Sequence, residues 1–254
     1  MPAQELTDTT ALVTGASSGF GRATTVALHN AGANVVAVAR NAQRLDELRD
    51  ELGGSLTTVT ADVADPVVAG SLLEQHRPKT LVLNAGAAPL MRPLQHHTWD
   101  TFNRNWEVDV RQAFHWIREA QLLPLAPQST VIALSSGAAL FGSPLSGGYA
   151  GAKATQRFIT GYAQDEARRA GLDIRFMVVL PRITPLTDVG RPAVRAYALR
   201  NGQTEEKYLQ GMGVPLRPEA AGAAVVELLH ADPATLAPGY LLSGAGLKEL
   251  PDGA

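Results

Sequence analysis

Three side chains in the middle of the 254-residue chain have the types and the spacing to move a proton. Ser136, Tyr149 and Lys153 lie in one stretch, and the tyrosine and lysine are four residues apart, so that in a helix they share a face. A phenol ordinarily titrates near ~10, and a neighbouring ammonium favours its deprotonated form. A serine hydroxyl at the same point could hold the oxygen that gains or loses the proton. An isolated tyrosine and lysine with this spacing are also typical of a half-buried tyrosine beside a solvated lysine. The surrounding elements must therefore show whether these residues are catalytic.

A glycine-rich segment near the start of the chain has the form of a phosphate-binding loop. The apolar run Ala11–Thr14 indicates a strand, and Arg22–Ala31 has the apolar spacing of a helix with one buried face. Glycines between them let the backbone turn sharply, and free N–H groups at a helix start attract anions. The glycine spacing differs from the better-known dinucleotide fingerprint, and a tight turn without a ligand is the alternative. We expect the cofactor to be bound by Gly15, Ser17, Ser18, Gly19, Phe20 and Gly21.

The second apolar run, Asn34–Ala39, is followed by a base where an acid would favour NAD(H). An acidic side chain there would bind the ribose hydroxyls, whereas a basic one accommodates the 2′-phosphate of NADP(H). Arg40 therefore favours NADP(H), with NAD(H) possible. The alternative is an arginine that only faces solvent.

Strands and helices alternate along the chain, which predicts an α/β fold of the doubly wound, Rossmann type. Such alternation implies a parallel sheet with right-handed connections, and ligands bind at the carboxyl ends of its strands. Gly15, Arg40, Asp62 and Asn84 all follow strand ends and therefore converge on one edge. The predicted strands are Ala11–Thr14, Asn34–Ala39, Leu56–Thr60, Thr80–Leu83, Ser129–Leu134, Asp173–Leu180 and Gly239–Leu242. The predicted helices are Arg22–Ala31, Asn41–Leu52, Asp65–His76, Thr98–Leu122, Tyr149–Ala170 and Arg217–His230.

Composition narrows the classes of function. A net charge of −2 argues against a nucleic-acid surface, and without cysteine there is no disulfide and no thiolate metal site. We expect no metal. The N-terminal residues lack a basic head followed by an apolar stretch, and no apolar run approaches the ~20 residues of a membrane span. We expect a single domain over residues 1–254, in the cytoplasm and with no membrane partner.

Together these motifs resemble the short-chain dehydrogenase/reductase family, in its compact single-domain branch, from about Thr10 to about Gly246. The motifs that carry the resemblance are Thr14–Gly21, the pair Asp62 and Val63, the element Asn84, Ala85 and Gly86, and Ser136 with Tyr149 and Lys153. The resemblance implies a seven-stranded parallel sheet with helices on both faces. It also implies reversible hydride transfer between a nicotinamide and a carbonyl carbon.

The family resemblance assigns a role to each of the three central side chains. Tyr149 would exchange the proton with the substrate oxygen, Lys153 would favour the phenolate and bind the nicotinamide ribose, and Ser136 would hold the substrate oxygen. Asp109 joins this catalytic set, because the family usually has an asparagine there, which anchors a water leading from the lysine to solvent. A carboxylate adds negative charge near Lys153, so we expect a working relay with a shifted pH optimum.

A second departure from the family lies after the sixth predicted strand. The family usually has Pro-Gly there, followed by residues that contact the nicotinamide carboxamide, and Arg182 replaces that glycine. The resemblance implies cofactor contacts from Pro181, Ile183 and Thr184, with Thr187 as the alternative to Thr184. Arg182 either alters this contact, meets an anionic substrate, or points outward into solvent.

The resemblance implies a small carbonyl compound or alcohol as the substrate, and the wall of its pocket is predicted to be mainly apolar. Residues 185–213 read as a mobile cover over the site. The rest of the wall is predicted from Ala88–Leu90, Ala138, Leu140 and Leu145, and the arginines of the cover are expected to be solvated. The family pairs its two long helices between subunits, which implies a homo-oligomer, a dimer or a tetramer. The alternatives are an NAD-linked alcohol dehydrogenase and a sensor that binds a dinucleotide without catalysis.

Overall fold

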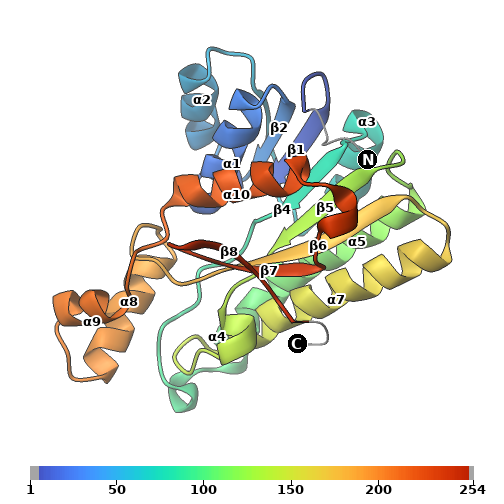
Figure 1. Ribbon diagram of the computed structural model, residues 1–254. Coiled ribbons are helices and arrows are strands. Elements are labelled where there is room, and N and C mark those ends of the chain that lie inside the picture. Colours follow the sequence, from blue (N-terminus) through green and yellow to red (C-terminus); the bar gives the residue numbers. More distant parts are fainter. Residues whose placement is uncertain (1–5, 252–254) are drawn as a thin grey trace.

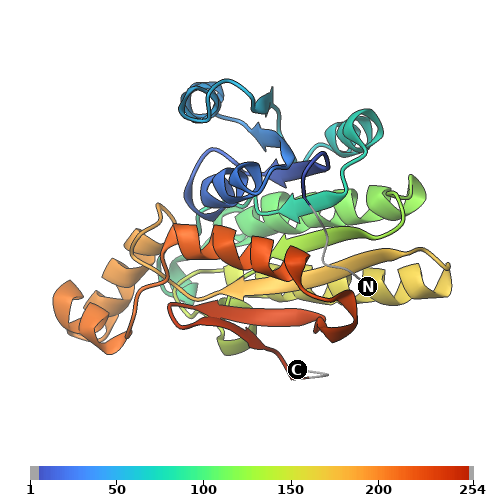
Figure 2. The same ribbon diagram turned by 45° about the horizontal axis from the view of Figure 1, so that its top comes forward.

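The computed structural model describes residues 6–251, which form one twisted sheet between two layers of helices (Figures 1 and 2). The strands are β1 (Thr10–Thr14), β2 (Asn34–Ala39), β3 (Thr57–Thr60), β4 (Thr80–Leu83), β5 (Ser129–Leu134), β6 (Ile174–Pro181), β7 (Gly239–Ser243) and β8 (Gly246–Glu249). Their order in the sheet is β3-β2-β1-β4-β5-β6-β7-β8. The first seven are parallel, so the predicted doubly wound fold is confirmed.

The eighth strand was not predicted. β8 runs antiparallel to β7, with Ser243 opposite Gly246 across a tight turn. Small residues fill this turn, Gly244 and Ala245, and Gly246 has a positive φ of 100°. The chain therefore closes the sheet with a hairpin, and the predicted count of seven strands is one too few.

Helices cover both faces of the sheet because each carries one apolar stripe. The helices are α1 (Gly19–Asn30), α2 (Ala42–Glu51), α3 (Pro66–His76), α4 (Trp99–Asn105), α5 (Arg111–Leu122), α6 (Ala138–Phe141), α7 (Tyr149–Arg169), α8 (Gly190–Arg200), α9 (Glu205–Gly211) and α10 (Pro218–His230). Leu28 of α1, Leu45 of α2 and Val225 of α10 belong to one buried core, and Trp116 of α5 belongs to a second. None of the helices within residues 6–251 is long and apolar enough to cross a membrane.

The predicted continuous helix Thr98–Leu122 is interrupted. A π-helical turn, η2 (Trp106–Val110), separates α4 from α5. Such turns insert an extra residue and are frequent at functional sites. Here the turn brings the side chain of Asp109 to full burial, whereas Glu107 in the same turn is exposed. The prediction was wrong because the apolar spacing continues through the insertion.

The predicted cover is helical. Residues 185–213 contain α8 and α9, which stand together beyond the carboxyl ends of the strands (Figure 1). Thr204 caps α9 by accepting a hydrogen bond from the Lys207 N–H. On α8, the exposed Arg195 forms an ion pair with Glu205 at 2.8 Å. The two helices thus form a small unit held to the sheet by the segments before and after it.

Candidate active site

The main cavity lies at the carboxyl ends of the parallel strands and has a volume of about 580 Å³. All of the predicted site residues line it except Gly21, which lies behind the glycine loop. The chain segments after β1, β2, β3, β4, β5 and β6 contribute to the wall. The predicted site residues therefore meet at one edge of the sheet, as the alternation of strands and helices led us to expect.

The glycine loop takes a shape that side chains would block. Gly15 and Gly19 have positive φ angles of 67° and 53°. A Cβ on Gly21 would lie 2.2 Å from the Asn84 Nδ2 and 2.3 Å from the Gly15 carbonyl oxygen. Asn84 donates from that amide to the carbonyl oxygens of Thr14 and Gly15, at 3.1 and 3.2 Å. Asn84 therefore holds the glycine loop through two hydrogen bonds, and the missing side chain at Gly21 lets α1 pack against the loop.

The start of α1 has the properties of an anion site. Ser18 is its N-cap, yet the serine side chain makes no capping hydrogen bond, and the first turn contains no acid. The first N–H groups of a helix have no partner within it and carry partial positive charge. The loop and this helix end therefore fit the phosphates of a dinucleotide.

Arg40 faces the same cavity from the end of β2. Its neighbours are engaged elsewhere: Arg22 pairs with Glu51, and Arg44 lies 3.5 Å from Asp188. Within residues 6–251 Arg40 itself has no ion pair, and it is exposed. The donor set therefore fits an additional phosphate on the adenosine ribose.

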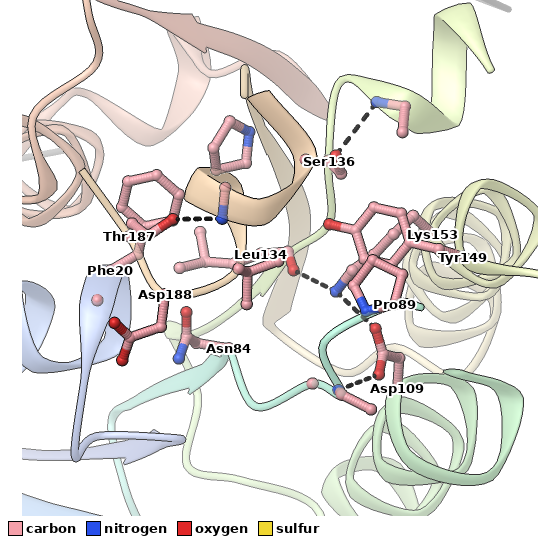
Figure 3. Close-up of a pocket in the computed structure, with 18 of the residues that line it drawn as sticks. Phe20, Asn84, Pro89, Asp109, Leu134, Ser136, Tyr149, Lys153, Thr187 and Asp188 are labelled. Carbon is pink, nitrogen blue, oxygen red and sulfur yellow. Dashed lines mark hydrogen bonds and ion pairs between the residues drawn. The ribbon is translucent and has the colours of Figure 1, made fainter. Parts of the chain in front are cut away.

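Ser136, Tyr149 and Lys153 lie together on another side of the cavity (Figure 3). Tyr149 begins α7 and Lys153 follows one turn later, with its ammonium 5.7 Å from the centre of the phenol ring. Ser136 follows β5, and its hydroxyl accepts a hydrogen bond from the Ala138 N–H at 3.2 Å. Ser135 points the other way and donates to the Lys153 carbonyl oxygen at 2.7 Å, which ties β5 to α7.

Lys153 is held by a buried ion pair. Its Nζ lies 3.2 Å from the Asp109 Oδ2 and 3.4 Å from the Leu134 carbonyl oxygen (Figure 3). The lysine side chain is 6% exposed and the aspartate side chain 0%. Taking two charges out of water is costly unless they are paired, so each of these groups requires the other.

Asp109 is fixed by further bonds that the sequence did not reveal. Its Oδ1 accepts from the Ala87 N–H at 2.7 Å, and its main-chain carbonyl oxygen accepts from the Gln156 Nε2 at 2.8 Å. Asn105, one turn earlier, donates to the Ala87 carbonyl oxygen at 2.7 Å. The carboxylate therefore ties the loop after β4 to the lysine, and its carbonyl is already bonded to α7.

Gln112 is a supporting residue that sequence reasoning missed. It is fully buried, accepts a hydrogen bond from the Thr14 hydroxyl at 2.6 Å and donates to the Ala85 carbonyl oxygen at 2.9 Å. The Thr14 hydroxyl also accepts from the N–H groups of Asn84 and Ala85. The sequence did contain a signal for this residue, because Gln112 is polar yet lies on the apolar face of the predicted helix Thr98–Leu122.

The segment after β6 meets the glycine loop. Arg182 donates from its main-chain N–H to the Leu242 carbonyl oxygen at 2.8 Å, and its side chain is exposed at the cavity wall. Thr184 is 1% exposed, and Thr187 lies opposite Gly19, within 3.7 Å of where a Cβ would stand. Both threonines line the cavity, so each remains a candidate for the cofactor contact.

The part of the cavity beyond Tyr149 is lined by apolar and aromatic residues, as predicted, but by a different set. Pro89 and Ala138 are present, and the others are Met91, Phe141, Ala193, Tyr197 and Tyr208. The predictions for Leu140 and Leu145 were wrong, because Leu145 is buried and Leu140 packs against the core formed by β5 and β6. Leu90 and Ala88 also lie outside the wall.

Two tyrosines join the cover to this wall. The Tyr197 hydroxyl lies 2.7 Å from the Ser143 hydroxyl, and its ring stacks on that of Tyr208. Burial raises the pKa of the Tyr208 phenol, and Tyr197 adds to the rise. Tyr208 is therefore a neutral hydroxyl at physiological pH.

Comparison with known proteins identifies the family. Residues 9–197 match the family described as short chain dehydrogenase, and the chain belongs to it. A stretch of 101 residues is 41% identical to the L-xylulose reductase of Mesocricetus auratus. It covers 40% of this chain and 41% of that protein. The match to carbonyl reductase [NADPH] 2 of Sus scrofa is 39% identical, across 41% and 42%. The chain thus matches about two-fifths of the length of these relatives.

A solved structure extends the likeness in fold to almost the whole chain. The crystal structure of levodione reductase has a TM-score of 0.81 with 23% identity, covering 94% of this chain and 98% of that one. At this identity the likeness concerns the fold alone. It agrees with the parallel arrangement of β1 to β7.

Proposed function

We propose that the protein is an NADP(H)-dependent oxidoreductase that interconverts a small ketone and its secondary alcohol. The observation that carries this proposal is the single cavity shared by the glycine loop, Arg40 and the trio Ser136, Tyr149 and Lys153. Family membership supports it, and so does the similarity over part of the chain to an L-xylulose reductase and to carbonyl reductase [NADPH] 2.

The side chains around Tyr149 would then divide the work of proton transfer. The phenol would donate the proton to the substrate oxygen during reduction and remove it during oxidation. The Ser136 hydroxyl would hold that oxygen where charge develops. Lys153 would favour the phenolate through its positive charge, 5.7 Å from the ring centre. When bound, the nicotinamide would supply or accept the hydride.

The preference for NADP(H) rests on Arg40. A guanidinium recognises a phosphate through two parallel hydrogen bonds, and no acidic side chain stands in its place to bind ribose hydroxyls. Thr14, Asn84 and Gln112 would hold the glycine loop in the shape that the phosphates require.

The direct test is consumption of NADPH with a panel of small ketones. We expect turnover that Tyr149→Phe lowers by about 10²- to 10⁴-fold, the usual contribution of a positioned acid or base, while NADPH still binds. Tyr162→Phe is the matched control, because Tyr162 lies on the same helix and is 63% exposed. Normal turnover by Tyr149→Phe would refute the assignment. Binding of NADPH without turnover of any carbonyl would favour a sensor, and a preference for NADH would favour an NAD-linked dehydrogenase.

We also propose that the protein forms a homo-oligomer through the exposed faces of α5 and α7. Phe114 on α5 is 52% exposed and Phe158 on α7 is 53% exposed, and large exposed apolar patches mark interaction surfaces. Light scattering should give a dimer or tetramer mass, and Phe158→Glu should lower it. A monomer mass for the parent protein would exclude this proposal.

A further inference from the structure

A second cavity, of about 510 Å³, adjoins the first on the side of the cover. Arg182, Ile183 and Tyr208 line both cavities. The far wall of the second cavity comes from α9 and the segment after it, including Met212 and Val214. Gly244 closes the floor: a Cβ there would lie 2.2 Å from the Val214 carbonyl oxygen, so the β7–β8 turn packs tightly on that segment.

The charges in this second cavity have one sign. Arg182 and Lys207 line it, and its other lining residues are neutral. Within residues 6–251 neither cation has an ion pair, although another arginine of the cover, Arg195, is paired with Glu205. Nearby polar groups, Asn201, Gln203 and Ser243, add hydrogen-bonding capacity. Two unpaired cations in one concave wall attract an anion. The second cavity therefore differs in charge from the apolar part of the first cavity.

The position of Arg182 connects this charge to the reaction site. Its Cα is 3.8 Å from where a Cβ on Gly137 would stand, and Gly137 directly follows Ser136. The main chain at Arg182 is fixed by its hydrogen bond to the Leu242 carbonyl oxygen. The exposed side chain of Arg182 thus starts from a fixed main-chain position beside the Ser136 loop and lines both cavities. Its guanidinium is therefore suited to bind a remote anionic group of a molecule whose oxygen lies at Ser136.

We propose that the second cavity binds the anionic end of the substrate, a carboxylate or a phosphate, while the carbonyl group lies beside Tyr149 in the first. This inference rests on the proposed function and narrows it: the substrate class is a ketone, or the corresponding alcohol, with an apolar body and a remote anionic group. Arg182 supplies a planar pair of donors, and Lys207 on α9 adds a second charge from the cover. Binding of such a substrate therefore links the cover to the strand ends.

The experiment compares acids with their neutral esters. The probes are a homologous series of methyl-ketone carboxylic acids beginning with levulinate, the methyl ester of each, and dihydroxyacetone phosphate as the phosphate arm. Binding is measured by calorimetry with saturating NADP⁺, a condition under which no hydride reaches the ketone, and kcat/KM is measured separately with NADPH. The proteins are the parent, Arg182→Gln, Lys207→Gln and the double variant, with Arg200→Gln as control because that exposed arginine of α8 lines neither cavity.

We expect the parent to bind the acid of the best chain length more tightly than its ester. Each single substitution should lower that preference about tenfold, as expected for one charge-assisted hydrogen bond, and the double variant should abolish it. The control should keep the preference of the parent. Equal affinity for acid and ester, or a preference that survives in the double variant, would overturn the inference. Charge-dependent binding without any turnover would support the anion-binding cavity and refute the proposed oxidoreductase function.

Discussion

Replacement of Asp109 by asparagine tests how the buried ion pair tunes the proton transfer. The carboxylate lies 3.2 Å from the Lys153 ammonium, and both side chains are buried. At an effective dielectric constant of about 20, such a pair attracts by about 5 kcal/mol. Asp109→Asn keeps an oxygen that can accept from the Ala87 N–H but removes the charge, so Lys153 is left without its counter-ion.

The consequence for catalysis follows from the distance between Lys153 and Tyr149. The ammonium is 5.7 Å from the ring centre, a distance at which two unit charges interact by about 3 kcal/mol at the same dielectric constant. The Asp109 carboxylate, 3.2 Å from the ammonium, opposes the field of Lys153 at the phenol, so its removal should move the pH profile of alcohol oxidation. Because alcohol oxidation needs the phenolate, the rise of its rate with pH should occur at lower pH in Asp109→Asn.

The assay is kcat/KM for alcohol oxidation with NADP⁺ over a range of pH, in the parent and in the variant. Glu107→Gln is the control, because it removes an equal charge from the same π-helical turn at an exposed position. There the Glu107 carboxylate pairs with Arg111 at 3.5 Å and accepts a hydrogen bond from the Asn103 Nδ2 at 2.9 Å. Its profile should match that of the parent. Superimposable profiles for the parent and Asp109→Asn would refute the reasoning, and so would a shift towards higher pH. Thermal unfolding should also show a loss of about 3–5 kcal/mol, the cost of breaking a buried pair from one side.

Four further substitutions test the cofactor loop, α7 and the cover. Arg40→Glu should lower kcat/KM for NADPH by more than tenfold and leave that for NADH much less affected, which steady-state kinetics with both cofactors would measure. Gly21→Ala should destabilise the fold by about 1–3 kcal/mol, because its Cβ would meet atoms at 2.2 and 2.3 Å. Gly161→Ala, in an open position within α7, should instead stabilise it by about 0.5–1 kcal/mol in the same denaturation assay. Tyr197→Phe removes the hydrogen bond to Ser143 and should raise KM for the ketone with little change in the KM for NADPH.

The sheet and the shared edge were predictable because they depend on local pattern. Buried parallel strands are continuous apolar runs, and the residues that follow them must meet at one edge whatever the details of packing. Gly15, Arg40 and Asp62 could be assigned to the cavity for that reason. The β7–β8 hairpin was not predicted because β8 is mostly exposed and only four residues long, so its sequence has no apolar run to detect.

The pocket wall could not be predicted to the same degree, because it depends on how one loop packs on another. Phe141 ends the short helix α6 and Leu145 lies in the loop after it, yet the leucine is buried in the protein and the phenylalanine is 72% exposed at the cavity. Nothing in their residue types distinguishes these two environments. Similarly, the unpaired state of Arg182 and Lys207 became visible only once the positions of all acidic groups in residues 6–251 were known.

Asp109 shows how a single substitution in a family pattern acquires meaning from its surroundings. The sequence indicated only that a carboxylate stands near Lys153. The structure adds that a π-helical turn buries it completely, that the Ala87 N–H fixes one of its oxygens, and that Gln156 holds its carbonyl. A charge held by these bonds cannot turn away from the lysine, and its 0% exposure keeps screening by solvent weak. The ion pair therefore contributes permanently to the electrostatic field at Tyr149, and removing the Asp109 charge should change the pH dependence of the reaction.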